Sequence, residues 1–266
     1  MEISFTKMHG LGNDFVVIDA VSQSINLSRE QIVALADRHF GIGCDQLLLV
    51  EKPTTSQAEF RYRIFNADGG EVEQCGNGAR CFAIFVRQQG LTTNTRISVE
   101  TAGGLIELRV ITNDSSDDLV TVDMGVPNFQ PQSLPFLTEN QAESYNLMVN
   151  GTEYAIAAVS MGNPHAVMLV DDLDKLDIET LGPAIEGHEL FPNRVNAGFM
   201  QIVNRDEIRL RVFERGAGET QACGTGACAA VAVGRASGQL DERVTVHLRG
   251  GDLSIQWQGE GQDLLM

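Results

Sequence analysis

One pattern of apolar and polar segments occurs twice along the chain. Residues 64–86 and residues 212–233 each have the pattern of a strand, then a glycine-rich polar loop, then a continuous apolar run. An apolar run that lacks a polar face is typical of a helix buried on all sides. Gly90 and Gly238 follow the two runs as helix stops. The pattern therefore predicts two strand–loop–helix units, each built around a buried helix.

The two copies align residue by residue at an offset of 148, which places Cys75 opposite Cys223. The same offset pairs Gly76 with Gly224, directly after each cysteine. At an offset of 150, Asn13 falls opposite Asn163 and Gln46 falls opposite Asn196. Repetition over this length indicates a repeated architecture rather than a chance motif. We therefore expect two halves of similar fold, with amide side chains at matching positions.

Short apolar segments flanked by glycine, asparagine and proline predict the strands of both halves. The predicted strands are 3–7, 15–19, 47–51, 60–65, 96–100 and 105–111, then 119–125, 145–149, 153–159, 166–171, 199–203, 208–213, 243–248 and 252–257. The capping-box spacing of Ser28 and Gln31 predicts a helix over 28–38, and another short helix is predicted over 177–186. Strands mixed with few helices indicate an α/β protein of the α+β type.

The polar, acidic segment 113–118 is the predicted linker between the halves. This places one domain at 1–118, carrying Cys75, and a second at 119–266, carrying Cys223, with 119–125 as the first strand of the second half. The counterparts of residues 119–125 would lie near 266–272, past Met266. We therefore expect the last strand of the second half to be missing or shortened.

Composition narrows the classes of partner. The formal net charge of −17 argues against nucleic acid and anionic membranes as binding partners. No apolar run has the length of a membrane span, and the first residues lack the basic region and apolar core of a signal peptide. The 5 cysteines are few, odd in number and widely spaced, which fits a reducing compartment. We expect a cytoplasmic protein with a small-molecule substrate.

The chemistry of the repeat lies in its two cysteines. The N-terminus of a helix carries partial positive charge and unpaired N–H groups, which lower the pKa of a thiol and bind carboxylates. If the halves pack face to face, Cys75 and Cys223 lie on opposite sides of one cleft. Two acid–base groups on either side of one carbon can invert a stereocentre, while the helix N-termini stabilise enolate-like charge. No lysine stands in a Schiff-base-like context, so nothing indicates pyridoxal phosphate.

Five motifs carry a family resemblance. They are KMHGLGNDF at 7–15, FNADG at 65–69, QCGNGAR at 74–80, MGNPH at 161–165 and ERGAGETQACG at 214–224. In these motifs, and over essentially its whole length, the chain resembles the diaminopimelate epimerase family. The resemblance implies an isomerase without cofactor or metal that interconverts LL- and meso-2,6-diaminopimelate, on the bacterial route to lysine and peptidoglycan. It also implies two pseudo-symmetric halves, each a mostly antiparallel sheet wrapped around its central helix, an active site in the cleft between them, and a homodimer.

The resemblance also assigns roles to residues. Cys75 and Cys223 are the implied acid–base pair, and His165 and Glu214 are the implied residues that tune their pKa values. The implied substrate-binding side chains are Asn13, Gln46, Asn66, Asn163, Asn196, Glu214 and Arg215, and the implied backbone donors are Gly76, Asn77, Gly224 and Thr225. Arg215 supplies the fork-shaped cation that an acidic protein needs to bind the far carboxylate of a dicarboxylate substrate.

Other hypotheses fit parts of the pattern. A proline-racemase type of enzyme would share the two thiols but needs no polar pocket for a distal group. A thiol redox protein would use the same cysteines, although Cys-x-x-Cys is absent from the sequence. A structural zinc site needs four ligands, and Cys75, Cys223 and His165 supply three at best. The amides could instead cap turns, and Arg215 could pair with Glu214.

Overall fold

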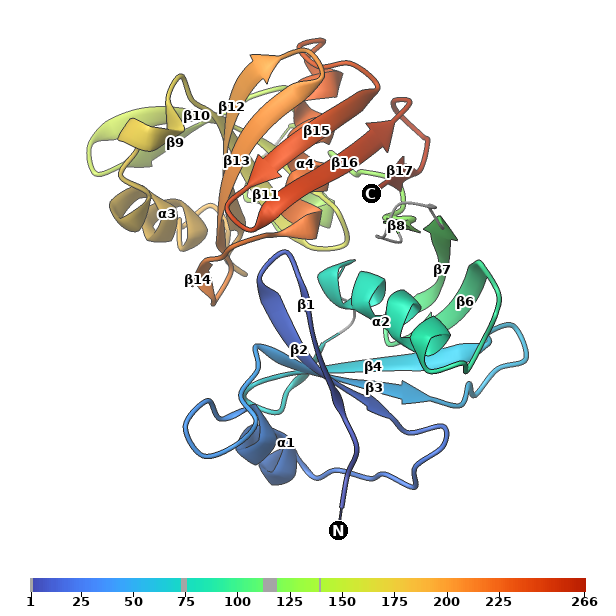
Figure 1. The fold of residues 1–266 in the computed structure, drawn as a ribbon. Coiled ribbons are helices and arrows are strands. Elements are labelled where there is room, and N and C mark those ends of the chain that lie inside the picture. The colour runs from blue at the N-terminus through green and yellow to red at the C-terminus, as the bar shows by residue number, and fades with distance from the viewer. Residues whose placement is uncertain (1, 73–75, 112–118, 139) are drawn as a thin grey trace. The chain divides into compact units, whose positions relative to one another are not determined.

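The structure is a computed structural model that describes residues 2–72, 76–111, 119–138 and 140–266 (Figure 1). It divides into two compact units, Met1–Asp123 and Met124–Met266. The sequence-based boundary lay after residue 118, five residues earlier. The difference arises because β8 (Leu119–Val122) pairs antiparallel with β7 (Gly104–Ile111), so this strand completes the first sheet instead of opening the second. Cys75 and the predicted linker 113–118 lie outside the described residues.

The first unit is a sheet in the order β1-β2-β3-β4-β6-β7-β8, with β5 paired to β4. Its other strands are β1 (Thr6–Gly10), β2 (Asn13–Asp19), β3 (Gln46–Glu51), β4 (Phe60–Asn66), β5 (Glu71–Val72) and β6 (Arg96–Thr101). The pairs β2–β3 and β4–β6 are parallel, and the remaining pairs are antiparallel. Helix α2 (Gly76–Gln88) contacts β1, β2, β3, β7 and β8. The sheet therefore wraps around this helix, as the sequence predicted.

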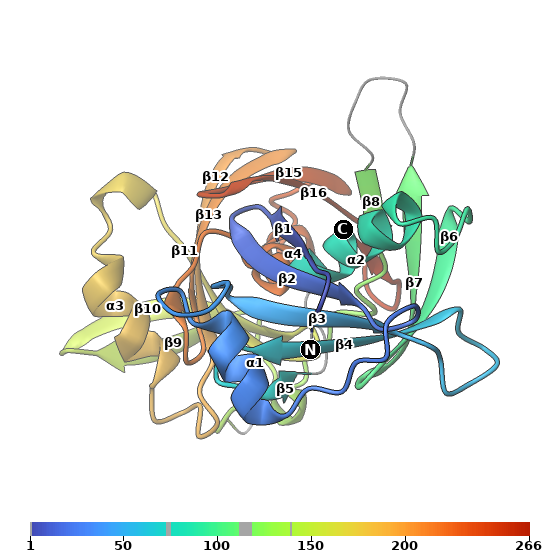
Figure 2. The same cartoon turned by 60° about the horizontal axis from the view of Figure 1, so that its bottom comes forward.

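The middle strands of this sheet are covered on both faces. Residues 15–18 of β2 are buried at 0–1% exposure, without the alternation of a one-sided strand. On one face they pack with Ile32 and Ala36 of α1 (Arg29–Ala36), which lies along the sheet in Figure 2. On the other face α2 approaches so closely that a Cβ on Gly78 would lie 2.5 Å from the Tyr62 hydroxyl. The apolar run of the sequence is the buried helix that fills this space.

The first hairpin corrects the sequence analysis. The predicted strands 3–7 and 15–19 left a long loop between them, but β1 and β2 pair as far as Gly10 and Asn13. Only Leu11 and Gly12 turn the chain, and both have left-handed φ angles, 54° and 87°. Two left-handed residues give the twist that a two-residue hairpin requires. Asn13 is thus held in a strand and not in a mobile loop.

The second unit repeats this plan in the order β17-β16-β15-β13-β12-β11-β10-β9, with β14 paired to β13. Its strands are β9 (Tyr145–Val149), β10 (Thr152–Ser160), β11 (Pro164–Leu169), β12 (Asn196–Asn204), β13 (Glu207–Glu214), β14 (Gly218–Glu219), β15 (Arg243–Leu248), β16 (Gly251–Trp257) and β17 (Leu264–Leu265). Its helices are α3 (Ile178–Glu186) and α4 (Gly224–Ala236), with short 3₁₀ turns at Pro131–Ser133 and Leu173–Lys175. Helix α4 contacts β10, β11, β12, β13 and β16, as α2 contacts the first sheet.

The two units match in their pairing as well as in their order. The pairs β11–β12 and β13–β15 are parallel, like β2–β3 and β4–β6. Phe15 lies opposite Gln46 in the first sheet, and His165 lies opposite Asn196 in the second. Both residues of the second pair are 150 positions further along the chain, the offset found in the sequence. The sequence repeat is therefore a repeat of fold. Within the described part of the chain, no helix is both long and apolar enough to span a membrane.

Candidate active site

Cys223 is the residue immediately before the first turn of α4. Its backbone is extended (φ −117°, ψ 108°), and its carbonyl accepts the first helical hydrogen bond from the Ala227 N–H, at 2.9 Å. The residue is only 4% exposed. A Cβ on Gly226 would lie 3.2 Å from the Cys223 sulfur and 2.9 Å from a methyl of Val212, so glycine lets the helix start close to the thiol. The predicted position at the N-terminus of a buried helix is confirmed.

The ionisation of Cys223 differs from the expectation. Burial raises the pKa of the thiol well above its ordinary value, and the negative charge of Glu214 raises it further. Hydrogen bonds that the sulfur makes with the Thr225 hydroxyl and the Gly226 N–H lower this pKa, because they stabilise the thiolate, but they do not outweigh burial. The expected lowering by the helix N-terminus was therefore wrong for this cysteine, because desolvation of the thiolate dominates. Cys223 is a protonated thiol at neutral pH.

Glu214 ends β13 and lies against this thiol. Its side chain forms a hydrogen bond with Cys223 and accepts one from the Thr220 hydroxyl at 2.5 Å. Burial raises the pKa of the Glu214 carboxyl, and these two hydrogen bonds oppose part of that rise. The structure thus places a carboxylate where the Cys223 proton can be held.

Asn163 and Thr225 continue the hydrogen-bond network from the same sulfur. The Thr225 hydroxyl lies 3.6 Å from the Cys223 sulfur, and the Asn163 amide N–H donates to that hydroxyl at 3.3 Å. The Asn163 carbonyl oxygen lies 2.9 Å from Nε2 of His165. Since an amide oxygen can only accept, Nε2 carries the imidazole proton. Asn163, a predicted substrate-binding residue, is therefore held from both sides.

His165 is 1% exposed and neutral. Burial, aided by the positive charge of Arg215, lowers its pKa to about 3. Its Nδ1 atom is a buried acceptor that has no hydrogen-bond partner among the described residues. Within the same residues its ring makes no direct hydrogen bond to Cys223, so its link to that thiol runs through Asn163 and Thr225.

Arg215 and Asn196 form the outer part of this half-site. The buried Asn196 amide accepts from the Arg215 backbone N–H at 2.9 Å and donates to the Pro164 carbonyl at 2.9 Å. The Arg215 guanidinium is exposed and donates a long hydrogen bond, 3.4 Å, to the Asn193 carbonyl. It forms no ion pair with any described carboxylate, so the alternative of a pair with Glu214 is not seen.

The first unit presents the corresponding half-site around the start of α2. The helix begins at Gly76, the residue that follows Cys75 in the chain. Asn77 is 3% exposed, and its amide donates to the Asn13 carbonyl oxygen at 3.4 Å. Arg80 donates to the Asn77 carbonyl oxygen at 2.7 Å, and Asn13 donates to Asp45 at 3.1 Å. Two predicted substrate-binding residues, Asn13 and Asn77, are thereby brought into contact.

Gln46 and Asn66 are a second contact pair of this unit. They face each other across β3 and β4, and the Gln46 amide donates to the Asn66 carbonyl oxygen at 2.9 Å. The Gln46 carbonyl oxygen is buried and has no partner among the described residues. A bare acceptor of this kind suits an ammonium group, which carries three donors.

Several residues that hold the predicted ones were missed by the sequence analysis. Asp45 orients Asn13, Thr220 holds Glu214, and Glu186 holds the turn that carries Arg215. Thr220 and Arg80 lie inside the recognised motifs, so closer attention to their polar side chains could have found them. The burial of Glu186 depends on tertiary packing, which no local pattern reveals.

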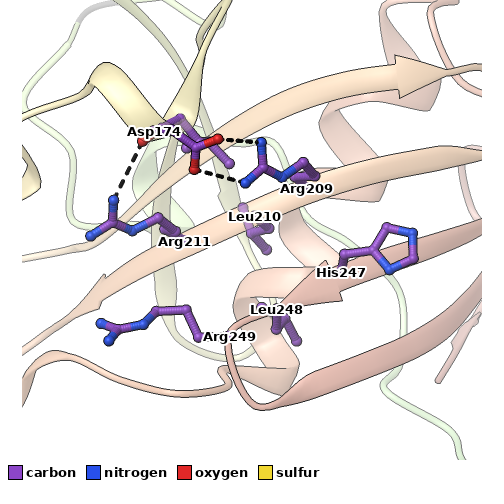
Figure 3. Close-up of a pocket in the computed structure, with 8 residues that line it drawn as sticks. Asp174, Arg209, Leu210, Arg211, His247, Leu248 and Arg249 are labelled. Atoms are coloured by element: carbon purple, nitrogen blue, oxygen red, sulfur yellow. Dashed lines mark hydrogen bonds and ion pairs between the residues drawn. The ribbon is translucent and has the colours of Figure 1, made fainter.

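A cavity of about 390 Å³ lies elsewhere on the second unit, along β13 and β15 (Figure 3). Its arginines Arg209 and Arg211 are held by Asp174 and Glu219. It contains none of the predicted site residues, and its arginines are already paired with carboxylates, so it is not the candidate site. Across the described residues, no group of three or more His, Cys, Asp or Glu is placed to hold a metal ion.

Comparison with known proteins gives a consistent assignment. A family profile described as diaminopimelate epimerase matches residues 5–130 and 157–266. The chain is 61% identical over 266 residues to a diaminopimelate epimerase of Chromobacterium violaceum, covering 100% of this chain and 95% of the relative. It is 58% identical, with the same coverage, to a diaminopimelate epimerase of Teredinibacter turnerae.

Solved structures of lower identity share the fold. A probable proline racemase from Agrobacterium radiobacter, with bound carbonate, matches with a TM-score of 0.70 at 14% identity, over 99% of this chain and 88% of that one. A hydroxyproline epimerase from Agrobacterium vitis, with bound trans-4-hydroxy-L-proline, matches with a TM-score of 0.66 at 15% identity, over 98% and 86%. On the family profile and the full-length relatives, the chain belongs to the diaminopimelate epimerase family.

Proposed function

We propose that the chain is a cofactor-independent isomerase that interconverts LL- and meso-2,6-diaminopimelate. The proposal is supported by relatives of that name and by one structural observation above all. Cys223 is a buried, protonated thiol at the N-terminus of α4, in contact with Glu214. A protonated thiol beside a carboxylate is suited to deliver a proton to carbon and to take one back.

The reaction needs one base and one acid of matching type. In the proposed step a Cys75 thiolate removes the α-proton, and the electron pair of the broken C–H bond moves into the α-carboxylate as an enolate. The Cys223 thiol then gives its proton to the opposite face of the carbon and becomes a thiolate. Cys75 now holds a proton and Cys223 does not, so the enzyme is ready for the reverse reaction. The proposal requires the two units to bring these thiols to opposite faces of one α-carbon.

The α-carboxylate is the group that develops charge. The N–H groups of the first turns of α2 and α4, from Gly76, Asn77, Gly224 and Thr225, have no helical carbonyl to bind. We propose that they hold this carboxylate and stabilise the enolate, which is the role of an oxyanion site. Loss of a single donor of this kind costs on the order of 10²-fold in rate in other enzymes.

The distal end of the substrate has its own carboxylate and ammonium group. We propose that Arg215 binds the distal carboxylate, since its guanidinium is exposed and makes no ion pair with the described carboxylates. The amides Asn13, Gln46, Asn66, Asn163 and Asn196 surround the substrate, and the bare Gln46 oxygen accepts from an ammonium group. His165 and Glu214 are proposed to set the pKa values of the thiols, Glu214 by contact with Cys223.

A proline-racemase type of activity remains the second candidate, because solved structures of that kind share the fold. Arg215 and the five amides favour a longer substrate with a polar far end. The decisive assay incubates EDTA-treated enzyme, without pyridoxal phosphate, with LL-diaminopimelate, L-proline or trans-4-hydroxy-L-proline. Chiral chromatography should show the meso product and leave both prolines unchanged. Inversion of proline, or a requirement for added cofactor, would overturn the proposal.

Two properties of the protein in the cell are part of the same proposal. The activity would serve the synthesis of lysine and of peptidoglycan precursors in the cytoplasm. We also propose a homodimer, which light scattering of the purified protein tests directly by its mass.

A further inference from the structure

Glu186 is a buried acid in the second unit that the proposed reaction does not use. It is the last residue of α3 and is 4% exposed. The C-terminal end of a helix carries partial negative charge, so a carboxylate there gains nothing from the helix. Its position is explained instead by what it binds. Figure 1 shows α3 beside the turn between β13 and β14, and α3 contacts both strands.

Both contacts of the carboxylate use the same oxygen. Oε1 of Glu186 accepts from the Gly216 backbone N–H at 2.9 Å and from the Arg194 guanidinium at 3.0 Å. Gly216 is the residue after Arg215 and has a left-handed φ of 73°, which glycine adopts without strain. The carboxylate thus fixes the turn at the residue that follows the proposed substrate-binding arginine.

Two further hydrogen bonds hold Arg215 itself. Its own backbone N–H donates to Asn196 at 2.9 Å, so consecutive N–H groups of the turn are bound by two buried side chains. The Arg215 guanidinium donates to the carbonyl of Asn193, next to Arg194, which Glu186 also binds. The acid therefore joins the segment 193–194 to the turn 215–216, and the arginine fork lies between these segments.

We infer that Glu186 is a positioning residue that fixes the Arg215 turn so that the guanidinium binds the distal carboxylate of the substrate. This inference rests on the proposed function. The described contacts of the Glu186 side chain are with Arg194 and Gly216 and not with Cys223, so we expect it to act on substrate binding through Arg215. A fork held in advance loses less freedom when it binds a carboxylate, which lowers KM more than it raises kcat.

The first test compares kcat and KM for diaminopimelate in Glu186→Ala, Glu186→Gln and Glu189→Ala. Glu186→Ala should raise KM about tenfold, the effect of about 1.4 kcal/mol of lost binding, with a smaller change in kcat. Glu186→Gln keeps an oxygen for the Gly216 N–H and should stay within about threefold of wild type. Glu189 is an exposed acid three residues further along, so Glu189→Ala controls for the loss of charge and should leave KM unchanged. A kcat loss without a KM change in Glu186→Ala would overturn the inference.

The second test asks whether Glu186 acts through Arg215. If it does, Glu186→Ala should change kcat/KM by less than about twofold when Arg215 is already alanine. The same tenfold loss in both backgrounds would show that Glu186 acts independently, and the inference would be wrong. Glu186→Asp, which withdraws the carboxylate by one methylene, gives the same comparison should the alanine variant not fold.

The third test does not depend on activity. Hydrogen–deuterium exchange of the backbone N–H of Gly216 should be faster in Glu186→Ala than in wild type, and unchanged in Glu189→Ala. Unchanged exchange at Gly216 in Glu186→Ala would overturn the inference that Glu186 holds this turn. If wild-type protein fails to convert diaminopimelate, the proposed function falls, whereas the exchange result still decides whether Glu186 holds the turn.

Discussion

The two units share one order of strands and differ in the chemistry around their matching amides. Asn13 in the first unit is bound by Asp45 and by the neutral Asn77, and the neighbouring Asp14 pairs with Lys7 and Arg38 at 2.7 Å each. The equivalent Asn163 in the second unit is held by two neutral groups, the Thr225 hydroxyl and the buried His165 ring. The repeat thus places amides alike in both units, with a carboxylate among the partners of the first and only neutral groups among the described partners of the second.

The same comparison separates the roles of the two halves. At the offset of 148, Glu214 stands opposite Asn66 and Arg215 stands opposite Ala67. At these two aligned positions the second half has a carboxylate and a cation, whereas the first half has an amide and an alanine. A repeated fold thus carries different charges at matching positions of its two halves.

The largest expected effect comes from removing either thiol. Cys223→Ser and Cys75→Ser should each lower kcat by on the order of 10²-fold or more, the scale of a lost acid–base group. The buried Cys228, inside α4, supplies the matched control, and Cys228→Ser should keep most of the activity of folded enzyme. Turnover near the wild-type value in either of the first two variants would contradict the two-thiol mechanism.

Arg215→Lys, which removes the guanidinium of the second unit without changing its charge, has the next largest expected effect. A lysine keeps the charge but cannot make the two-pronged contact with a carboxylate, so kcat/KM should fall about tenfold. Arg205→Lys, at an exposed pair with Asp241, is the control and should have no effect. Equal kcat/KM in wild type and Arg215→Lys would show that the cation does not bind substrate.

Glu214→Gln tests the carboxylate that lies beside Cys223 in the second unit. Its charge raises the pKa of Cys223, so its removal should lower that pKa. Where Cys223 acts as the acid, activity falls as pH rises through this pKa, and the variant should begin its fall about one unit lower. The pH profile of kcat, measured in both directions, shows the shift in the direction in which Cys223 is the acid. A fall at the wild-type pH, or at a higher one, would contradict the contact.

The smallest expected effect is on how the free energy of unfolding depends on pH. The contribution of Asp14 in the first unit should grow with rising pH, and that of His247 in the second unit should decline. In the first unit burial alone would raise the pKa of Asp14, but Arg38 and Lys7 bring it below the usual range, so its contribution is present above about pH 4 and lost in acid. In the second unit Asp252 chiefly, and also Glu207, raise the pKa of His247, so its contribution is present below about pH 6.5 and lost as pH rises through the raised value.

Urea unfolding at several pH values measures both contributions. Asp14→Asn should lose stability at neutral pH and little in acid, while His247→Gln should lose stability in mild acid and little in alkali. Because both groups are partly exposed, each change should stay below about 1 kcal/mol. Parallel pH curves for wild type and either variant would contradict the assigned contribution.

The features that local patterns of apolar and polar residues determine were predicted correctly from the sequence. The two buried helices, the capping box at Ser28 and the strands predicted at 145–149 and 153–159 are present as expected. The short hairpin at Leu11 was not predicted, because a left-handed leucine is unusual and its sequence gives no sign of it. The boundary also moved, since strand pairing and not loop polarity assigns residues 119–122 to a sheet.

The motifs selected residues that the structure brings into contact, but the sequence did not predict the pKa of Cys223. The contacts of Asn13 with Asn77 and of Asn163 with Thr225 join residues that the motifs had selected. The pKa of Cys223 was misjudged because the helix N-terminus is visible in sequence, whereas burial beside an acid is a tertiary property. The sequence analysis also did not select Glu186, because its burial is likewise a tertiary property.

The central claim is that two acid–base groups act on opposite faces of one carbon. Proton NMR of LL-diaminopimelate with the enzyme in D₂O tests it most directly, at conversions of about 10% or less. With two bases, the new proton comes from a group already exchanged with solvent, so the meso product should carry deuterium at one α-carbon. The remaining LL substrate should still carry hydrogen. Deuterium in the remaining substrate at the same rate as in the product, or meso product without deuterium, would contradict the account.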